Sequence, residues 1–175
     1  MAFGRPRCFV FDRGVHDMVR LIPMTDDEFQ LYYRRAVEDY ANEHVEAGNW
    51  HPSVAIQESE KQFQRLLPNG VASKDQYLYA IVDDAGRKVG VLWLAVRYQS
   101  GIRPYAFVYD FLIDEEFRRR GYGRQAFEVL EEKVKEMGLD SISLHVFGHN
   151  QPAIALYQAA GYETTDLQMV KRLSG

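Results

Sequence analysis

The chain of 175 residues has the length and composition of one ordinary globular domain. Its net charge of −4 excludes a globally basic surface, which argues against a nucleic-acid partner. No apolar run approaches the roughly 20 residues of a membrane helix, so we expect no membrane partner. Cys8 is the only cysteine, which favours a cytoplasmic location. We expect residues 1–17 to be an N-terminal extension, or a wrongly assigned start, before a single domain over 18–175.

The first segment of this domain predicts a short strand and a helix. Residues 19–22 form the strand candidate. Thr25 then opens a helix, because its hydroxyl can cap free amides and Glu28, three residues on, completes a capping box. Residues 48–49, Gly-Asn, end this helix. Its inward positions follow helical spacing and comprise Phe29, Tyr33, Ala36, Val37 and Tyr40.

The middle of the chain predicts a second helix and a hairpin. The helix covers about 53–67. Two runs rich in aromatic and β-branched residues follow at 77–82 and 88–96, and the turn sequence 83–86 separates them, which is typical of an antiparallel hairpin. The positions of the second helix expected to face inward are Ile56, Phe63 and Leu67.

Strands and helices alternate in the remainder of the chain. The nearly continuous apolar run at 105–113 predicts a central strand that is covered on both faces. A helix is expected over 121–137, a strand over 141–147, a helix over 152–160 and a last strand over 164–173. This order predicts an α/β or α+β fold with a mixed sheet and an antiparallel hairpin in its middle.

A glycine-containing loop between the strand at 105–113 and the next helix carries the first functional signal. Such a loop exposes unpaired amides at the positive end of a helix dipole. Gly121 and Gly123 permit a close approach of phosphate groups, and arginines add positive charge. The arginines are Arg118, Arg119, Arg120 and Arg124.

Three further kinds of loop are compared with this segment. A solvated basic turn would contain the same residues. A Walker loop is excluded because its lysine-containing glycine pattern is missing from the sequence. A permissive dinucleotide fingerprint, with Ala126 in the third glycine position, is disfavoured because a hairpin precedes the loop.

A second motif lies 26 residues beyond Arg124, in the segment 150–162, NQPAIALYQAAGY. Together, the two segments resemble the GCN5-related N-acetyltransferase (GNAT) superfamily. That family pairs an R/Q-x-x-G-x-G/A loop with a downstream N-x-x-A-x-x-L-Y-x-x-x-G-F/Y helix. The likeness covers residues 76–173. It implies a mostly antiparallel sheet flanked by helices and splayed between strands 4 and 5.

The resemblance also implies roles for individual residues. The loop amides would bind the pyrophosphate of acetyl-CoA, a cosubstrate that requires no metal. The backbone of Leu112 and Ile113 would pair with the pantetheine arm, Asn150 would hydrogen-bond it, and Tyr157 would face the thioester sulfur. The loop residues concerned are Arg118, Arg119, Arg120, Gly121, Tyr122, Gly123 and Arg124.

The chemistry of amine acetylation is consistent with these roles. A phenol with a pKa near ~10 is protonated at neutral pH and can donate to a thiolate, which makes Tyr157 the candidate acid. A lysine-like amine with a pKa of about 10.4 must lose a proton first, so a base is needed. Asp110, whose pKa burial would have to raise, is the first candidate, and His145 is the second. The amide of Leu112 or Ile113 would stabilise the oxyanion.

The sequence departs from the family pattern at two of these positions. Arg119 stands where the family often has glycine, which the loop would tolerate if its φ stayed negative. Asp110 stands where some members have glutamate. The prediction is an enzyme that acetylates a primary amine of a small molecule or peptide. A non-catalytic acyl-CoA sensor and a nucleotide-binding protein are the alternatives, and a homodimer is possible by analogy.

Overall fold

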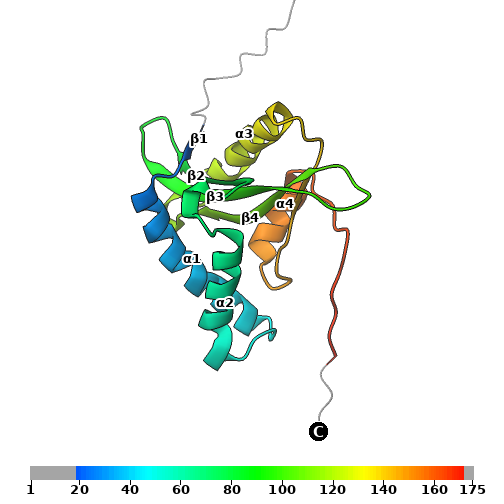
Figure 1. Cartoon of the computed structure of the whole chain (residues 1–175). Coiled ribbons are helices and arrows are strands. Elements are labelled where there is room, and N and C mark those ends of the chain that lie inside the picture. Colours follow the sequence, from blue (N-terminus) through cyan, green and yellow to red (C-terminus); the bar gives the residue numbers. More distant parts are fainter. Residues whose placement is uncertain (1–18, 172–175) are drawn as a thin grey trace, which may run out of the picture.

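The computed structural model describes residues 19–171, which form a five-stranded sheet with helices on both faces (Figure 1). The mixed and mostly antiparallel fold predicted from the sequence is confirmed. The predicted boundary at residues 17 and 18 lies outside the described residues. The elements are β1 (Arg20–Pro23), α1 (Asp26–Glu46), α2 (Pro52–Leu66), β2 (Gln76–Val82), β3 (Lys88–Arg97), β4 (Tyr105–Ile113), α3 (Tyr122–Glu136), β5 (Ile142–Leu144) and α4 (Gln151–Ala159), with short 3₁₀ turns at Gly70–Ala72 and Glu115–Phe117.

Helix α1 begins at the N-cap residue that the sequence predicts, Thr25. The amide of Glu28 donates to Thr25 Oγ1 at 3.3 Å, and the amide of Thr25 donates to Glu28 Oε2 at 2.9 Å. This reciprocal pair confirms the predicted capping box. The prediction for Ile56 is wrong, because its side chain is 44% exposed. Helix α2 instead turns inward the face spaced four residues apart, which consists of Ala55, Ser59 and Phe63.

The five strands lie in sequence order, and only the last pair, β4 and β5, is parallel. The sheet is therefore centred on β3, whose residues 89–95 are all buried. Strand β4 is covered on both faces as predicted, because Val108 packs in a cluster with α3 residues and Tyr109 packs against one with α1 residues. It lies beside the edge strand, however, and is only partly buried. Pairing with β5 ends at Val108 and Leu144, whereas β4 continues to Ile113, so the predicted opening between the fourth and fifth strands is present.

A β-bulge interrupts β4 near its middle. Asp110 pairs with Trp93 on β3, but Val108 pairs with the next β3 residue, Leu94, so Tyr109 is an extra residue. Side chains alternate along a strand, and one inserted residue moves the following side chains to the opposite face. Without the bulge, Asp110 would share the face of Val108.

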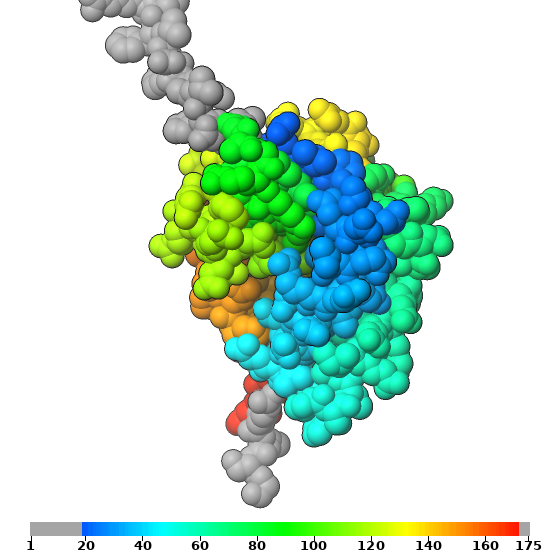
Figure 2. All heavy atoms as spheres, turned by 90° about the vertical axis from the view of Figure 1, so that its left-hand side faces the viewer, coloured from blue at the N-terminus to red at the C-terminus, as the bar shows by residue number. Residues whose placement is uncertain are grey.

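Two hydrophobic cores lie on opposite faces of the sheet (Figure 1). The first joins the sheet to α3 through Phe127 and Leu130, with α4 packed against it through Leu156 and Tyr157. The second joins the other face to α1 and α2, with Trp93 among its buried residues. Figure 2 shows the molecule from the side where α1 (blue) lies next to the yellow-green segment that follows β4.

The predicted strand at 164–173 is wrong over its described part, because residues 162–171 form neither a helix nor a strand. Leu167 and Met169 are 81% and 90% exposed. The edge strand β5 has only three residues and so offers little length for pairing. Among the helices in residues 19–171, none combines the length and apolar character needed to cross a bilayer.

Candidate functional site

The first turn of α3 presents a row of backbone donors. The helix is capped at Gly121, which has a φ of 87°, and no side chain within the described residues caps it. The first hydrogen bond of the helix runs from the amide of Gln125 to the carbonyl of Gly121. No acceptor within residues 19–171 pairs with the amides of residues 119–124. These amides and the helix dipole make a local positive site of the kind that binds phosphate groups.

Two of the loop arginines hold the loop against the protein. Arg118 Nε donates to the carbonyl of Ile113 at 2.9 Å, a contact that closes the turn between β4 and α3. The guanidinium of Arg120 lies 5.8 Å from the ring centroid of Phe117. Arg118 therefore fixes the shape of the loop through a backbone carbonyl, a role that the sequence did not predict.

Arg119 has a left-handed backbone. Its φ is +62°, so the expectation of a negative φ at this position is wrong. This conformation costs a residue with a side chain roughly 1–2 kcal/mol, which explains in physical terms why glycine suits the position. Arg124, at the start of α3, is exposed and lies 3.0 Å from Glu128 through its Nε atom.

Gly123 serves the packing of α3 on α4. A Cβ atom at this residue would lie 3.3 Å from Leu156 Cδ2 and 3.9 Å from Ile113 Cγ1. A side chain on Gly123 would thus be directed at Leu156, and the predicted approach of phosphates to the backbone of this glycine stays a prediction. A groove of about 370 Å³ lies beside this contact, between α3 and α4. Its lining residues are Arg124, Phe127, Glu128, Glu131, Leu156, Ala159 and Ala160.

The side chain of Tyr122 is directed away from this groove. Its hydroxyl donates to Asp83 Oδ2 at 3.4 Å, and Asp83 also lies 2.7 Å from Arg87 Nη2. Because Asp83 follows β2 and Arg87 precedes β3, this group ties the first turn of α3 to the hairpin. Tyr122 can reach a ligand of the loop through its amide but uses its hydroxyl structurally.

Leu112 and Ile113 have different backbone surroundings. The carbonyl of Leu112 is directed at β3, where it would lie 2.2 Å from a Cβ atom at Gly90. The carbonyl of Ile113 accepts from Arg118 instead. Gly90, which no sequence motif indicated, is required because only glycine allows this approach of two strands.

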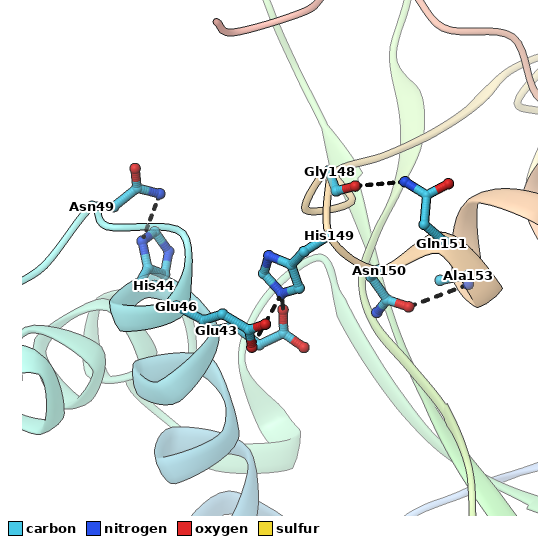
Figure 3. Close-up of polar contacts among 9 residues, drawn as sticks. All are labelled: Glu43, His44, Glu46, Asn49, Gly148, His149, Asn150, Gln151 and Ala153. Atoms are coloured by element: carbon cyan, nitrogen blue, oxygen red, sulfur yellow. Dashed lines mark hydrogen bonds and ion pairs between the residues drawn. The ribbon is translucent and has the colours of Figure 1, made fainter. Parts of the chain in front are cut away.

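Asn150 begins α4 rather than standing free in the cleft. Its Oδ1 atom accepts a hydrogen bond from the amide of Ala153 at 3.2 Å, as Figure 3 shows. The following residues, Gln151 and Pro152, form the first turn of the helix. The side-chain oxygen of Asn150 thus serves as the N-cap of α4. This cap fixes the start of the helix and, two turns later, the position of Tyr157.

Asp110 and Tyr157 reach the opening beside β4 from the two faces of the sheet. Asp110 contacts α1, since it accepts a hydrogen bond from Tyr32 Oη at 3.0 Å. Tyr157 is on α4 and packs against the first core. Burial raises the pKa of Tyr157 to about 12, and the nearby charge of Asp110 adds to the effect. Burial also raises the pKa of Asp110, although the Tyr32 hydrogen bond opposes the shift.

Two histidines, His145 and His149, follow β5 in the chain. His145 is exposed, and its ring stands edge-on to Phe147 at 5.0 Å. His149 Nε2 lies 2.9 Å from Glu43 Oε2 and 3.6 Å from Glu46 Oε2, so it connects the loop before α4 to the end of α1 (Figure 3). Over residues 19–171, no three His, Cys, Asp or Glu side chains are arranged to hold a metal ion.

Tyr32 is the residue of this region that sequence reasoning missed. The expected inward stripe of the first helix contained Tyr33, but Tyr32 is the buried member, at 3% exposure. The available signal was its spacing from Phe29 and Ala36, three residues before it and four after it, which places it on their face of the helix. A tyrosine buried there needs a partner for its hydroxyl.

Comparison with known proteins agrees with this architecture. Residues 30–162 match the family model described as the acetyltransferase (GNAT) family. The chain is 36% identical to the uncharacterized N-acetyltransferase YdgE of Bacillus subtilis over 86% of this chain and 95% of the relative. It is 37% identical to the uncharacterized N-acetyltransferase YycN of the same organism, over 89% of this chain and 99% of the relative.

Solved structures show the same fold. The crystal structure of YycN from Bacillus subtilis superposes with a TM-score of 0.85 over 90% of this chain and 99% of that one. An aminoglycoside 6'-N-acetyltransferase of Acinetobacter baumannii has a TM-score of 0.54 at 20% identity, over 90% of this chain and 99% of that one, and shares the fold alone. By its matching family model, its two similar relatives and its fold, this chain belongs to the GNAT family of acetyltransferases.

Proposed function

We propose that this protein transfers an acetyl group from acetyl-CoA to a primary amine by direct attack. The observation that carries the proposal is the row of unpaired amides at residues 119–124, beside the groove between α3 and α4. Those amides suit the pyrophosphate of CoA. Beyond Val108, the edge of β4 that β5 leaves unpaired suits the extended pantetheine arm, and Leu112 and Ile113 lie on that length.

The two ionisable side chains at the opening supply the proton transfers. The neutral amine attacks the thioester carbonyl, so that a C–N bond forms and the C–S bond breaks. Asp110 takes the proton that the amine loses, and its raised pKa makes it a stronger base than an ordinary aspartate. Tyr157, with a pKa of about 12, stays protonated at neutral pH and donates to the leaving sulfur. It regains a proton from solvent, and the net products are an amide and free CoA.

The acceptor is a primary amine of a small molecule or peptide, and the protein acts without a metal. A second candidate function is an acyl-CoA sensor that binds without turnover. The presence of both Tyr157 and Asp110 at one opening favours the enzyme, because binding alone requires neither a donor nor a base there.

Calorimetric titration with acetyl-CoA, free CoA and NAD separates these functions from a nucleotide-binding protein. We expect acetyl-CoA and CoA to bind and NAD to bind more weakly. Release of CoA in the presence of a panel of amines then distinguishes the enzyme from the sensor. Tighter binding of NAD than of CoA would overturn the proposal.

Substitution of Tyr157 by phenylalanine tests the proposed acid. We expect turnover to fall about 10²-fold or more, the lower range for loss of a general acid, with acetyl-CoA affinity within a few-fold of wild type. Tyr162→Phe is the matched control, since Tyr162 packs beside Tyr157 at 5.9 Å between ring centroids. Equal turnover in wild type and Tyr157→Phe would remove Tyr157 as the acid.

A further inference from the structure

The hydrogen bond between Tyr32 and Asp110 joins two elements that are 78 residues apart in the chain. Tyr32 lies in the second core, where the residue is 3% exposed, and its hydroxyl donates to Asp110 Oδ2 at 3.0 Å. The bond spans the interface between α1 and the bulged part of β4. A buried donor of this kind can exchange its partner for water only at a considerable cost in free energy, so the bond holds the carboxylate in one place.

The Tyr32–Asp110 hydrogen bond is better sheltered from solvent than the other polar contacts of α1 in this region. One helical turn later, Arg35 Nη1 lies 3.4 Å from Asp114 Oδ1, and Arg35 Nε lies 3.9 Å from Asp39 Oδ2. The Arg35 side chain is 43% exposed, so these pairs are weak and screened by solvent. The hydrogen bond of Tyr32 therefore contributes more to holding α1 on β4 than the exposed ion pairs of Arg35 do.

The bulge and the tyrosine act together on Asp110. The inserted Tyr109 turns the Asp110 side chain toward α1, and Tyr32 then binds one of its two oxygens. The second oxygen, Oδ1, is the one that Tyr32 does not bind and that can take a proton. An aspartate held in this way does not have to lose side-chain freedom when the amine arrives.

We propose that Tyr32 is a positioning residue for acetyl transfer, which holds the Asp110 carboxylate at the opening beside β4. This inference rests on the proposed function, in which Asp110 takes the proton of the amine. Tyr32 itself touches neither the acetyl group nor the amine in this scheme. It acts only through the carboxylate that it binds.

The groups that face Asp110 set the expected pH dependence. They are Tyr32, Arg35 and Asp39 from α1, the amide of Phe111 in β4 and Tyr157 from α4. Burial raises the pKa of Asp110, and the Tyr32 hydrogen bond is the largest influence that lowers it. Activity that needs the ionised carboxylate is lost as pH falls through this pKa. Removing the Tyr32 hydroxyl must therefore move the loss of activity to higher pH.

Tyr32→Phe tests this inference, with Tyr33→Phe as the matched control on the same helix. We expect the acidic limb of the kcat/KM profile to move up by about one pH unit in Tyr32→Phe, the size of a hydrogen bond to a charged group. Acetyl-CoA affinity should stay within a few-fold, and the profile of Tyr33→Phe should match wild type. In an Asp110→Asn background, Tyr32→Phe should leave the pH profile nearly unchanged, because the carboxylate through which Tyr32 acts is absent. An unmoved acidic limb in a folded Tyr32→Phe protein would overturn the proposal.

A measurement without turnover separates this inference from the proposed function. In isotope-labelled wild-type protein, the Asp110 carboxyl resonance, assigned with Asp110→Asn, should titrate together with the phenol carbon of Tyr32. Tyr32→Phe should raise the midpoint of the Asp110 titration. If the chemical shift of the Tyr32 phenol carbon does not change as Asp110 titrates, the positioning role is overturned even if the protein is an active acetyltransferase. Coupled titrations in a protein that acetylates no amine would instead leave the contact intact and remove the proposed function.

Discussion

Burial of the Asp110 carboxyl has opposite effects on the stability of the fold and on the proposed activity. Burial raises the pKa of its carboxyl in the folded protein. The folded state therefore binds the proton more tightly than the unfolded chain does, and the ionised carboxylate destabilises the fold at neutral pH. Active-site groups often carry such a cost.

Replacing Asp110 by asparagine should therefore stabilise the protein while it lowers turnover. We expect a Tm higher by about 2–4 °C at pH 7, the effect of roughly 1 kcal/mol in a domain of this size. The gain should be present above the folded-state pKa of Asp110 and should vanish below the unfolded-state value of about 3.9. Thermal unfolding between pH 3 and pH 8 measures it. A Tm that falls at pH 7, in a variant whose circular dichroism spectrum matches wild type, would contradict the prediction.

Other residue-level features follow from backbone conformation. Arg119 is one of two non-glycine residues with a positive φ within residues 19–171, the other being Asp75. A left-handed residue at the entrance to a helix helps to turn the preceding amides outward, toward a ligand of the loop. The arginine at this position combines that conformation with a positive charge.

At the scale of elements, the contact between α3 and α4 decides the shape of the groove. Gly123 brings the first turn of α3 against Leu156, and Leu156 directly precedes Tyr157 on α4. A side chain on Gly123 would press on the end of the Leu156 side chain, next to Tyr157. Packing of the two helices and the position of the candidate acid are thus coupled.

Gly123→Val should lower stability by about 1–3 kcal/mol, the usual effect of overpacking, and should weaken acetyl-CoA binding as a consequence. Leu156→Ala in the same chain should recover part of the lost stability, because it makes room for the new side chain. Urea unfolding of the single and double variants measures this coupling. Gly148→Val is the control, since a Cβ atom there meets nothing within 4 Å. Full stability with lost binding would instead favour direct blocking of the phosphates.

At the scale of the whole molecule, the described end of the chain differs from the rest. Residues 163–171 are all exposed, and the apolar side chains of Leu167 and Met169 face solvent. Exposed apolar residues in an extended segment contribute little to the stability of the chain that carries them.

The double substitution Leu167→Ser with Met169→Ser should leave Tm within about 2 °C of wild type, as surface changes usually do. Leu130→Ser, at a fully buried position of α3, is the contrasting variant and should lower Tm strongly. Thermal unfolding and sedimentation velocity measure both effects. A large drop in Tm in the double variant would contradict the prediction, and loss of a dimer in sedimentation would show that this segment packs against a second copy of the chain.

Local signals in the sequence were sufficient for most elements of the fold. The capping box at Thr25, the hairpin turn and the loop before α3 are determined by residues that are close in the chain, so their physical causes can be read directly. The same holds for the family, because its two motifs are local. The described part of the predicted last strand, 164–171, was wrong because a strand needs a partner, and pairing is a tertiary property.

The arrangement of the candidate site depended on contacts between distant parts of the chain. The bulge at Tyr109 reverses the face of Asp110, and no alternation pattern reveals an inserted residue before the strands are paired. Tyr32 becomes the partner of Asp110 only when α1 packs on β4. The sequence by itself determined most of the elements, the amide-rich loop and the family. The tertiary structure decided which side chains meet at the opening, because burial and hydrogen bonding there join residues that the chain keeps far apart.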